Sequence, residues 1–72
     1  MKPPKKALGP AVRSLRIERG YTQESFAKHA GLDRSYYSAI ERGNFNVTLD
    51  TLVKVAAALG VSASTLLRRA KL

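Results

Sequence analysis

A short stretch that begins at Arg34 has the side chains needed to recognise the edges of base pairs. If residues 34–42 form a helix with Tyr37 facing inward, Arg34 lies at the exposed N-terminal end and Tyr36 on the flank. The outward face then consists of Ser35, Ser38, Ala39 and Arg42. Small serine and alanine side chains let a backbone enter the major groove of DNA, and an arginine can bond both O6 and N7 of guanine. The stretch therefore favours base recognition, although an ordinary solvent-exposed helix face has the same composition.

The chain lacks the residue groups that other kinds of chemistry require. It contains no cysteine, which excludes a disulfide scaffold, a thiolate metal site and a cysteine nucleophile. His29 is the single histidine and has no second ligand at a suitable spacing, so we expect no metal and no other cofactor. No carboxylate pair and no nucleophile beside a base stands out, so the chain is not expected to be an enzyme.

The charge of the chain indicates a polyanionic partner. Its 72 residues include 13 lysines and arginines against 5 aspartates and glutamates, a net charge of +8 at pH 7. Nucleic acid is the first partner that this charge suggests, and an anionic lipid surface is the second. The basic residues gather at the two ends of the chain: Lys2, Lys5, Lys6, Arg13, Arg16 and Arg19, then Lys54, Arg68, Arg69 and Lys71.

Membrane insertion and secretion are not expected. No apolar run approaches the ~18 residues that a membrane span needs, and none behind Lys6 is long enough for a signal peptide. A cytoplasmic location is therefore expected. A peripheral membrane helix at 63–69, with Leu66 and Leu67 beside Arg68 and Arg69, is an alternative that its short length argues against.

One small all-α domain is predicted to hold these residues in place. A chain of 72 residues is long enough for a single core, and no segment shows the sustained alternation of a strand. Residues 1–6 are expected to form a flexible basic arm, because Pro3-Pro4 cannot start a packed element and lysines prefer water. The domain is then expected to cover residues 7–72.

Five helices with short connections are predicted within this domain. Helical periodicity starts at Leu8, with Pro10 in the first turn and Ile17 on the face opposite the core. Candidate N-caps and glycine stops delimit the next helices: Thr22 and Gly31, Asp33 and Gly43, Thr48 and Gly60, and finally Ser62. The fourth helix is expected to bury a stripe of Leu49, Leu52, Val53, Ala56 and Leu59. The helices at 23–30 and 34–42 have the layout of a helix-turn-helix.

The sequence resembles the phage repressor/Cro family of helix-turn-helix domains, the Xre-type regulators. The similarity is carried by Thr22-Gln23-Glu24-Ser25-Phe26-Ala27, Gly31-Leu32-Asp33-Arg34-Ser35-Tyr36 and Ile40-Glu41-Arg42-Gly43. This resemblance implies a compact five-helix fold like that of the lambda repressor. In size the chain is similar to the restriction–modification controller proteins and to small prophage regulators.

The resemblance also implies a transcriptional regulator that binds a palindromic operator on double-stranded DNA as a homodimer. Positions that match base-contacting residues of the family are Arg34, Ser35, Ser38 and Ala39. Gln23 matches the family's phosphate-contacting glutamine, and weaker phosphate candidates are Tyr36, Arg42, Asn44 and Arg19. Arg16 and Glu41 match a pair that forms a buried salt bridge in this family.

Apolar residues near the C-terminus are the expected dimer interface, because one short terminal helix cannot bury them all on its own domain. They are Val61, Leu66, Leu67 and Leu72.

Two functions stay open for such a fold. The first is the DNA-binding regulator, and the alternative is an antitoxin or partner-binding module in which DNA binding is secondary.

Overall fold

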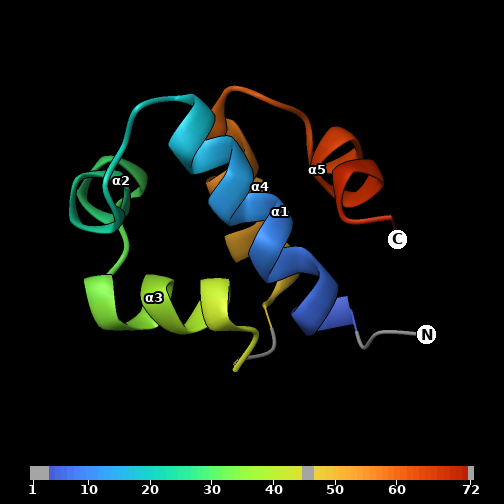
Figure 1. The fold of residues 1–72 in the computed structure, drawn as a ribbon, viewed down its shortest axis with the longest axis horizontal. Coiled ribbons are helices and arrows are strands. Elements are labelled where there is room, and N and C mark those ends of the chain that lie inside the picture. Colours follow the sequence, from blue (N-terminus) through green and yellow to red (C-terminus); the bar gives the residue numbers. More distant parts are fainter. Residues whose placement is uncertain (1–3, 45–46, 72) are drawn as a thin grey trace.

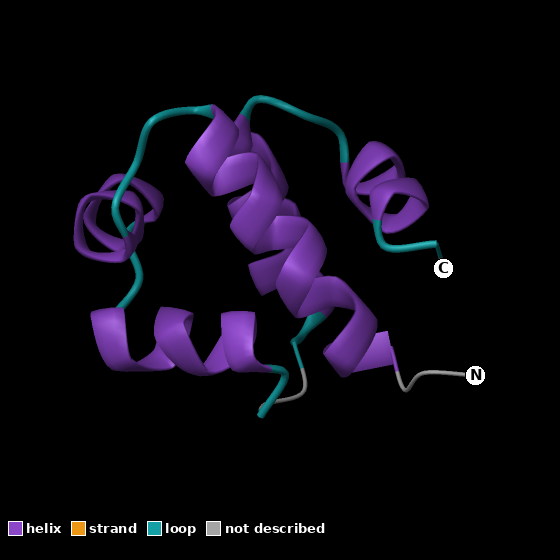
Figure 2. Ribbon diagram, in the orientation of Figure 1, coloured by secondary structure: helices purple, strands orange, loops and turns teal. Residues whose placement is uncertain are grey.

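The computed structural model describes residues 4–44 and 47–71, and these residues form five helices and no strand. The helices are α1 (Pro4–Glu18), α2 (Gln23–Ala30), α3 (Arg34–Arg42), α4 (Leu49–Leu59) and α5 (Ala63–Arg69). The long α1 runs diagonally through the molecule, with α2 and α5 on opposite sides of it and α3 across its lower end (Figure 1). Short loops join α1 to α2, α2 to α3 and α4 to α5 (Figure 2). The prediction of an all-α, five-helix fold is confirmed.

Each helix from α2 to α5 begins at a predicted N-cap, namely Thr22, Asp33, Thr48 and Ser62. At the start of α2 the cap is reciprocal, since Thr22 Oγ1 accepts from the Ser25 N–H at 3.0 Å and Ser25 Oγ accepts from the Thr22 N–H at 2.9 Å. Gly31 ends α2 with a φ of 73°, a left-handed conformation that glycine adopts without a steric penalty. The turn at Gly31 and the cap at Asp33 together determine where α3 starts.

The first helix begins earlier than the sequence predicted. Pro4, Lys5 and Lys6 belong to α1, although the sequence placed residues 1–6 in a flexible arm. Pro4 is the first helical residue, where a missing N–H breaks no intrahelical bond, so it starts the helix instead of preventing it. Pro10 consequently lies inside α1 and not in its first turn. The remainder of the expected arm, residues 1–3, lies outside the described residues.

A single core lies between the helices and receives side chains from all five. Its largest fully buried members are Val12, Leu15, Phe26, Tyr37, Ile40, Val55, Leu59 and Leu66. Leu66 has no exposed surface, because α5 packs it against α1 and α4. The prediction that Leu66 lies in a dimer interface is therefore wrong. Val61 and Leu67 are half-buried, and Leu72 lies outside the described residues.

The fourth helix buries a narrower stripe than predicted. Val55, Ala56 and Leu59 are buried, but Leu49 is 72% exposed and Val53 is 51% exposed. Leu49 and Val53 are four residues apart and share one side of α4, whereas α4 packs on α2 and α5 through its other side. Ile17, at 52% exposure, lies on the surface of α1 as predicted.

One glycine allows α1 to approach the end of α3. A β-carbon on Gly9 would lie 2.3 Å from the carbonyl oxygen of Glu41 and 2.9 Å from that of Ile40. Both neighbours are backbone atoms, so no flexible side chain could move aside. Gly9 thus helps to set the orientation of α3 relative to α1, a role that sequence reasoning did not assign to it.

Candidate nucleic-acid interface

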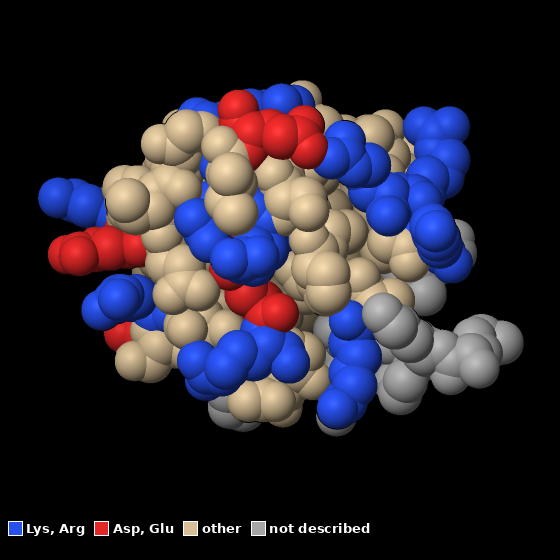
Figure 3. Space-filling model, in the orientation of Figure 1, with Lys and Arg blue, Asp and Glu red and all other residues tan. Residues whose placement is uncertain are grey.

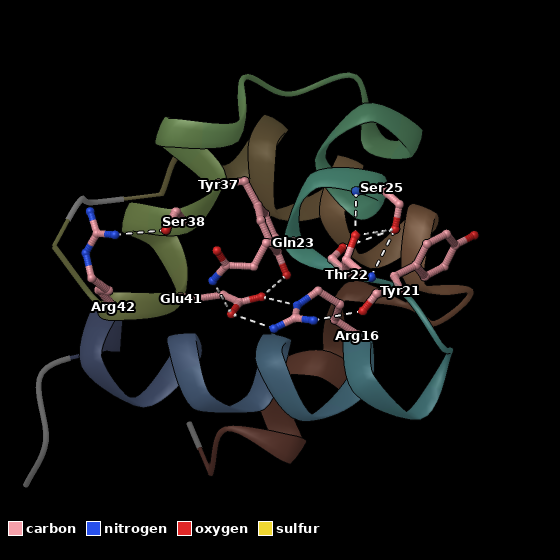
Figure 4. A network of polar contacts seen from close by, with 9 residues as sticks. All are labelled: Arg16, Tyr21, Thr22, Gln23, Ser25, Tyr37, Ser38, Glu41 and Arg42. Atoms are coloured by element: carbon pink, nitrogen blue, oxygen red, sulfur yellow. Dashed lines mark hydrogen bonds and ion pairs between the residues drawn. The ribbon is translucent and has the colours of Figure 1, made fainter.

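The carboxylate of Glu41 is the centre of a buried network behind α3 (Figure 4). Glu41 Oε2 accepts from Arg16 Nε at 2.6 Å and from the Tyr37 hydroxyl, and Oε1 accepts from Arg16 Nη2 at 3.2 Å. Gln23 Nε2 donates to Oε1 at 3.0 Å, and Arg16 Nη1 donates to the Tyr21 carbonyl at 2.8 Å. The network ties α1 and α2 to α3. It contains the ion pair that the resemblance implied and adds two side chains, Gln23 and Tyr37, and the Tyr21 carbonyl.

Hydrogen bonds keep this network charged in spite of its burial. Burial by itself would raise the pKa of Glu41, but bonds from Arg16, Tyr37 and Gln23 outweigh it and hold that pKa below its ordinary value. The bond to Glu41 raises the pKa of Arg16. Burial and the adjacent carboxylate raise the pKa of Tyr37, so its hydroxyl stays protonated and remains a donor.

The stability of the domain should fall in acid because of Glu41. Its pKa is lower in the folded chain than the ordinary value of 4.5, so its contribution is complete above that pH and disappears as the pH falls through the folded-state value. Urea unfolding between about pH 7 and pH 3 measures this change. Glu41→Gln should be less stable at neutral pH and lose less free energy of unfolding on acidification. Equal losses in the two proteins would assign the acid sensitivity to another group.

The opposite side of α3 faces solvent and carries most of the predicted base-contacting residues. Arg34, Ser35, Ser38 and Arg42 line an open hollow on this outward face. Arg34, Ser35 and Arg42 are exposed and Ser38 is half-buried. Arg42 Nη1 donates to Ser38 Oγ at 2.8 Å, a bond between successive helical turns (Figure 4). The structure therefore brings Arg34, Ser35 and Ser38 together on one surface.

Ala39 does not belong to this surface. It is only 2% exposed, so the prediction that it contacts a base is wrong. A helical wheel with Tyr37 inward places Ala39 about 160° from Tyr37, well inside the outward face. Its burial therefore comes from packing by other parts of the chain, which a wheel drawn for one helix does not include.

The candidate phosphate-contacting residues separate into two places. Near α3 lie half-buried Gln23 and Tyr36 and exposed Arg42 and Asn44. Arg19 instead donates from Nε to the Leu59 carbonyl at 3.0 Å and so satisfies a carbonyl at the end of α4. This contact is at the end of α1 that lies away from α3 (Figure 1). Arg19 thus has a structural partner that the sequence did not indicate.

Positive charge extends well beyond α3. In Figure 3 lysine and arginine side chains are spread over the face from the level of α3 to α5, with acidic side chains at fewer places among them. Among the described residues, Glu18 pairs with Arg69. In the described part of the chain no three acidic, histidine or cysteine side chains are grouped as metal ligands. No single helix there is long and apolar enough to cross a membrane, although the bent pair α4 and α5 reaches the length and composition together.

The chain has relatives among known regulatory proteins. Residues 12–66 match the protein family described as helix-turn-helix. Control protein C.MunI from Mycoplasma is 48% identical over 59 residues, which are 81% of this chain and 80% of that protein. The Neisseria meningitidis protein called "Neisseria hypothetical transcription factor" is 48% identical over 56 residues, 78% of this chain, and the match spans only 53% of that longer relative.

A solved structure supports the same comparison at the level of the fold. The restriction-modification controller protein C.AhdI from Aeromonas hydrophila superposes with a TM-score of 0.82 at 40% sequence identity. The superposition covers 86% of this chain and 94% of C.AhdI.

Proposed function

Because the chain belongs to the helix-turn-helix family, we propose that it is a sequence-specific transcriptional regulator that binds double-stranded DNA through the outward face of α3. The observation that carries this proposal is the division of α3 into two sides. Glu41 anchors the inner side, and Arg34, Ser35 and Ser38 are presented on the outer side. The relatives support it, since they are named as a control protein and a transcription factor. For such a regulator we propose a cytoplasmic location.

Base contacts and phosphate contacts come from different helices in this proposal. Arg34 opens α3, where a side chain can reach the major groove and bond guanine through O6 and N7. Gln23 opens α2, and a helix N-terminus with free N–H groups is a site for a phosphate. One N–H of its amide is bonded to Glu41, and the other is free to donate to that phosphate. The net charge of +8 adds attraction that does not depend on sequence.

The contribution of Arg34 is tested by selecting bound sequences from a random pool of duplex DNA. Arg34→Ala should lose preference at one base pair in each half-site, at a cost of about 1–3 kcal/mol, and should bind random DNA almost as well as before. Gln23→Ala is the contrasting variant, because losing a phosphate contact weakens all operators by a similar factor and keeps their ranking. If Arg34→Ala weakened every sequence equally, Arg34 would be a backbone contact.

We also propose that the protein binds a palindromic operator as a two-fold homodimer in which α4 takes part. Leu49 and Val53 are the exposed large apolar side chains of α4, and they adjoin exposed Asp50 and Lys54. In an antiparallel contact between two α4 helices, Asp50 of one copy would lie near Lys54 of the other. Such a patch is complementary to itself, as a two-fold interface requires. Half-sites about one helical turn apart would follow.

Sedimentation of two variants tests this interface. In each variant an aspartate replaces an apolar residue, and the two replaced residues are equally exposed. Val53→Asp should give monomers at tens of micromolar and bind a palindromic operator more weakly, because the new charge would be buried between the two copies. Ile17→Asp is the matched control, since Ile17 is as exposed as Val53 but lies on α1, and it should remain dimeric. A wild-type protein that stays monomeric with and without operator would contradict the proposal.

A further inference from the structure

Ser38 and Arg42 form one hydrogen-bonded unit on the outward face of α3. The 2.8 Å bond from Arg42 Nη1 to Ser38 Oγ lies within the hollow that Arg34 and Ser35 also line. Figure 4 shows it well separated from the buried network around Glu41. The bond between Ser38 and Arg42 is therefore not required to hold α3 in the fold. Its geometry instead determines which groups Ser38 can bond in a molecule that enters the hollow.

The bond from Arg42 fixes the direction of the Ser38 hydroxyl proton. A guanidinium is permanently protonated and has no acceptor, so Ser38 Oγ must be the acceptor in the bond. The single hydroxyl proton of Ser38 then points away from Arg42. Within residues 4–44 and 47–71, no group accepts that proton. Ser38 is thus prepared to act as a donor toward a molecule outside the chain.

We propose that Arg42 is a positioning residue that makes Ser38 a hydrogen-bond donor to a base in the major groove. This inference rests on the proposed function, because it concerns the same DNA-binding face. Adenine, guanine and thymine present an acceptor there, at N7, at N7 and O6, or at O4, whereas cytosine presents its N4 amino group as a donor. Arg42 occupies one of the two lone pairs of Ser38 Oγ and turns the hydroxyl proton outward. Ser38 therefore favours an acceptor base over cytosine at one position of each half-site.

The spacing on α3 predicts where that position lies. Ser38 follows Arg34 by four residues, which is about 6 Å along the helix axis. Successive base pairs are about 3.4 Å apart. With α3 lying in the groove, the base that Ser38 contacts is roughly two base pairs from the guanine that Arg34 contacts.

Titration of the selected operator and its single-base variants tests the inference with four proteins: wild type, Ser38→Ala, Arg42→Met and the double variant. The wild type should bind an acceptor base at this position about fivefold more tightly than cytosine, the effect of one ordinary hydrogen bond. Each single variant should lose this preference and keep the preference for the guanine of Arg34. The double variant should lose no more than either single variant, because both residues serve one contact.

Two controls separate this role from loss of charge or of structure. Lys28→Met removes an exposed charge from α2 and should keep the preference at both positions. Thermal melting should be unchanged in all variants, since neither Ser38 nor Arg42 bonds to the buried network. The inference would be overturned if Arg42→Met lowered the affinity for all sequences by one factor and kept the preference against cytosine. Arg42 would then be a phosphate contact. A wild type that selects an operator but tolerates cytosine there also overturns it, whereas failure to bind any duplex overturns the proposed function itself.

Discussion

Replacing Gly9 with alanine should destabilise the domain by about 3 kcal/mol or more, the upper end of the cost of overpacking. In an ordinary helix this change would be favourable by about 1 kcal/mol, because alanine is the better helix former. Here the new β-carbon would lie 2.3 Å from the Glu41 carbonyl oxygen, and α1 would have to move away from α3. A domain of this size has a free energy of unfolding of only about 5–15 kcal/mol, so the loss is a large fraction of it.

Thermal and urea unfolding followed by circular dichroism measure the effect of Gly9→Ala. Ser14→Ala is the matched control, because Ser14 is exposed on the same helix and its replacement changes helix propensity without a new contact. The control should be as stable as the wild type or slightly more stable. If Gly9→Ala were also as stable as the wild type, α1 would not lie against the end of α3 as described.

Arg16→Ala should cost about 3–5 kcal/mol, because it leaves the Glu41 carboxylate buried without its ionic partner. Tyr37 and Gln23 would still donate to the carboxylate, but both are neutral groups. The variant should also bind DNA less well, since the network fixes α3 against α1 and α2.

Arg13→Ala is the control for Arg16→Ala. Arg13 has the same charge and lies three residues earlier on α1, but it is exposed, so its removal should change stability little. Chemical unfolding of the two variants gives the comparison directly. Equal midpoints would mean that the pair with Glu41 contributes no more than a surface charge does.

Helix boundaries in this protein were largely predictable because their signals are local. The caps at Thr22, Asp33, Thr48 and Ser62 act on N–H groups two or three residues away, and the residues that form them are adjacent in the sequence. The start of α1 was missed because Pro3-Pro4 and the lysines were interpreted as signs of a solvated arm. Pro4 is nevertheless compatible with the first turn of a helix.

Contacts between helices were harder to predict because they depend on packing angles that no single helix determines. The close approach at Gly9, the bond from Arg19 to Leu59 and the attachment of Gln23 to Glu41 all join residues distant in sequence. The same cause explains the errors at Ala39, Leu49, Val53 and Leu66. Each lies where the neighbouring helices decide which side chains remain exposed.

The most direct test of the DNA-binding face is an NMR titration of the isotopically labelled protein with a selected duplex. We expect the largest changes in backbone amide signals at Gln23 and at Arg34, Ser35 and Ser38. A random duplex should affect the same region more weakly, because the phosphate contacts remain when the base contacts are lost. Large changes confined to α5, with the signals of α3 unmoved, would contradict the assignment of α3 as the recognition helix.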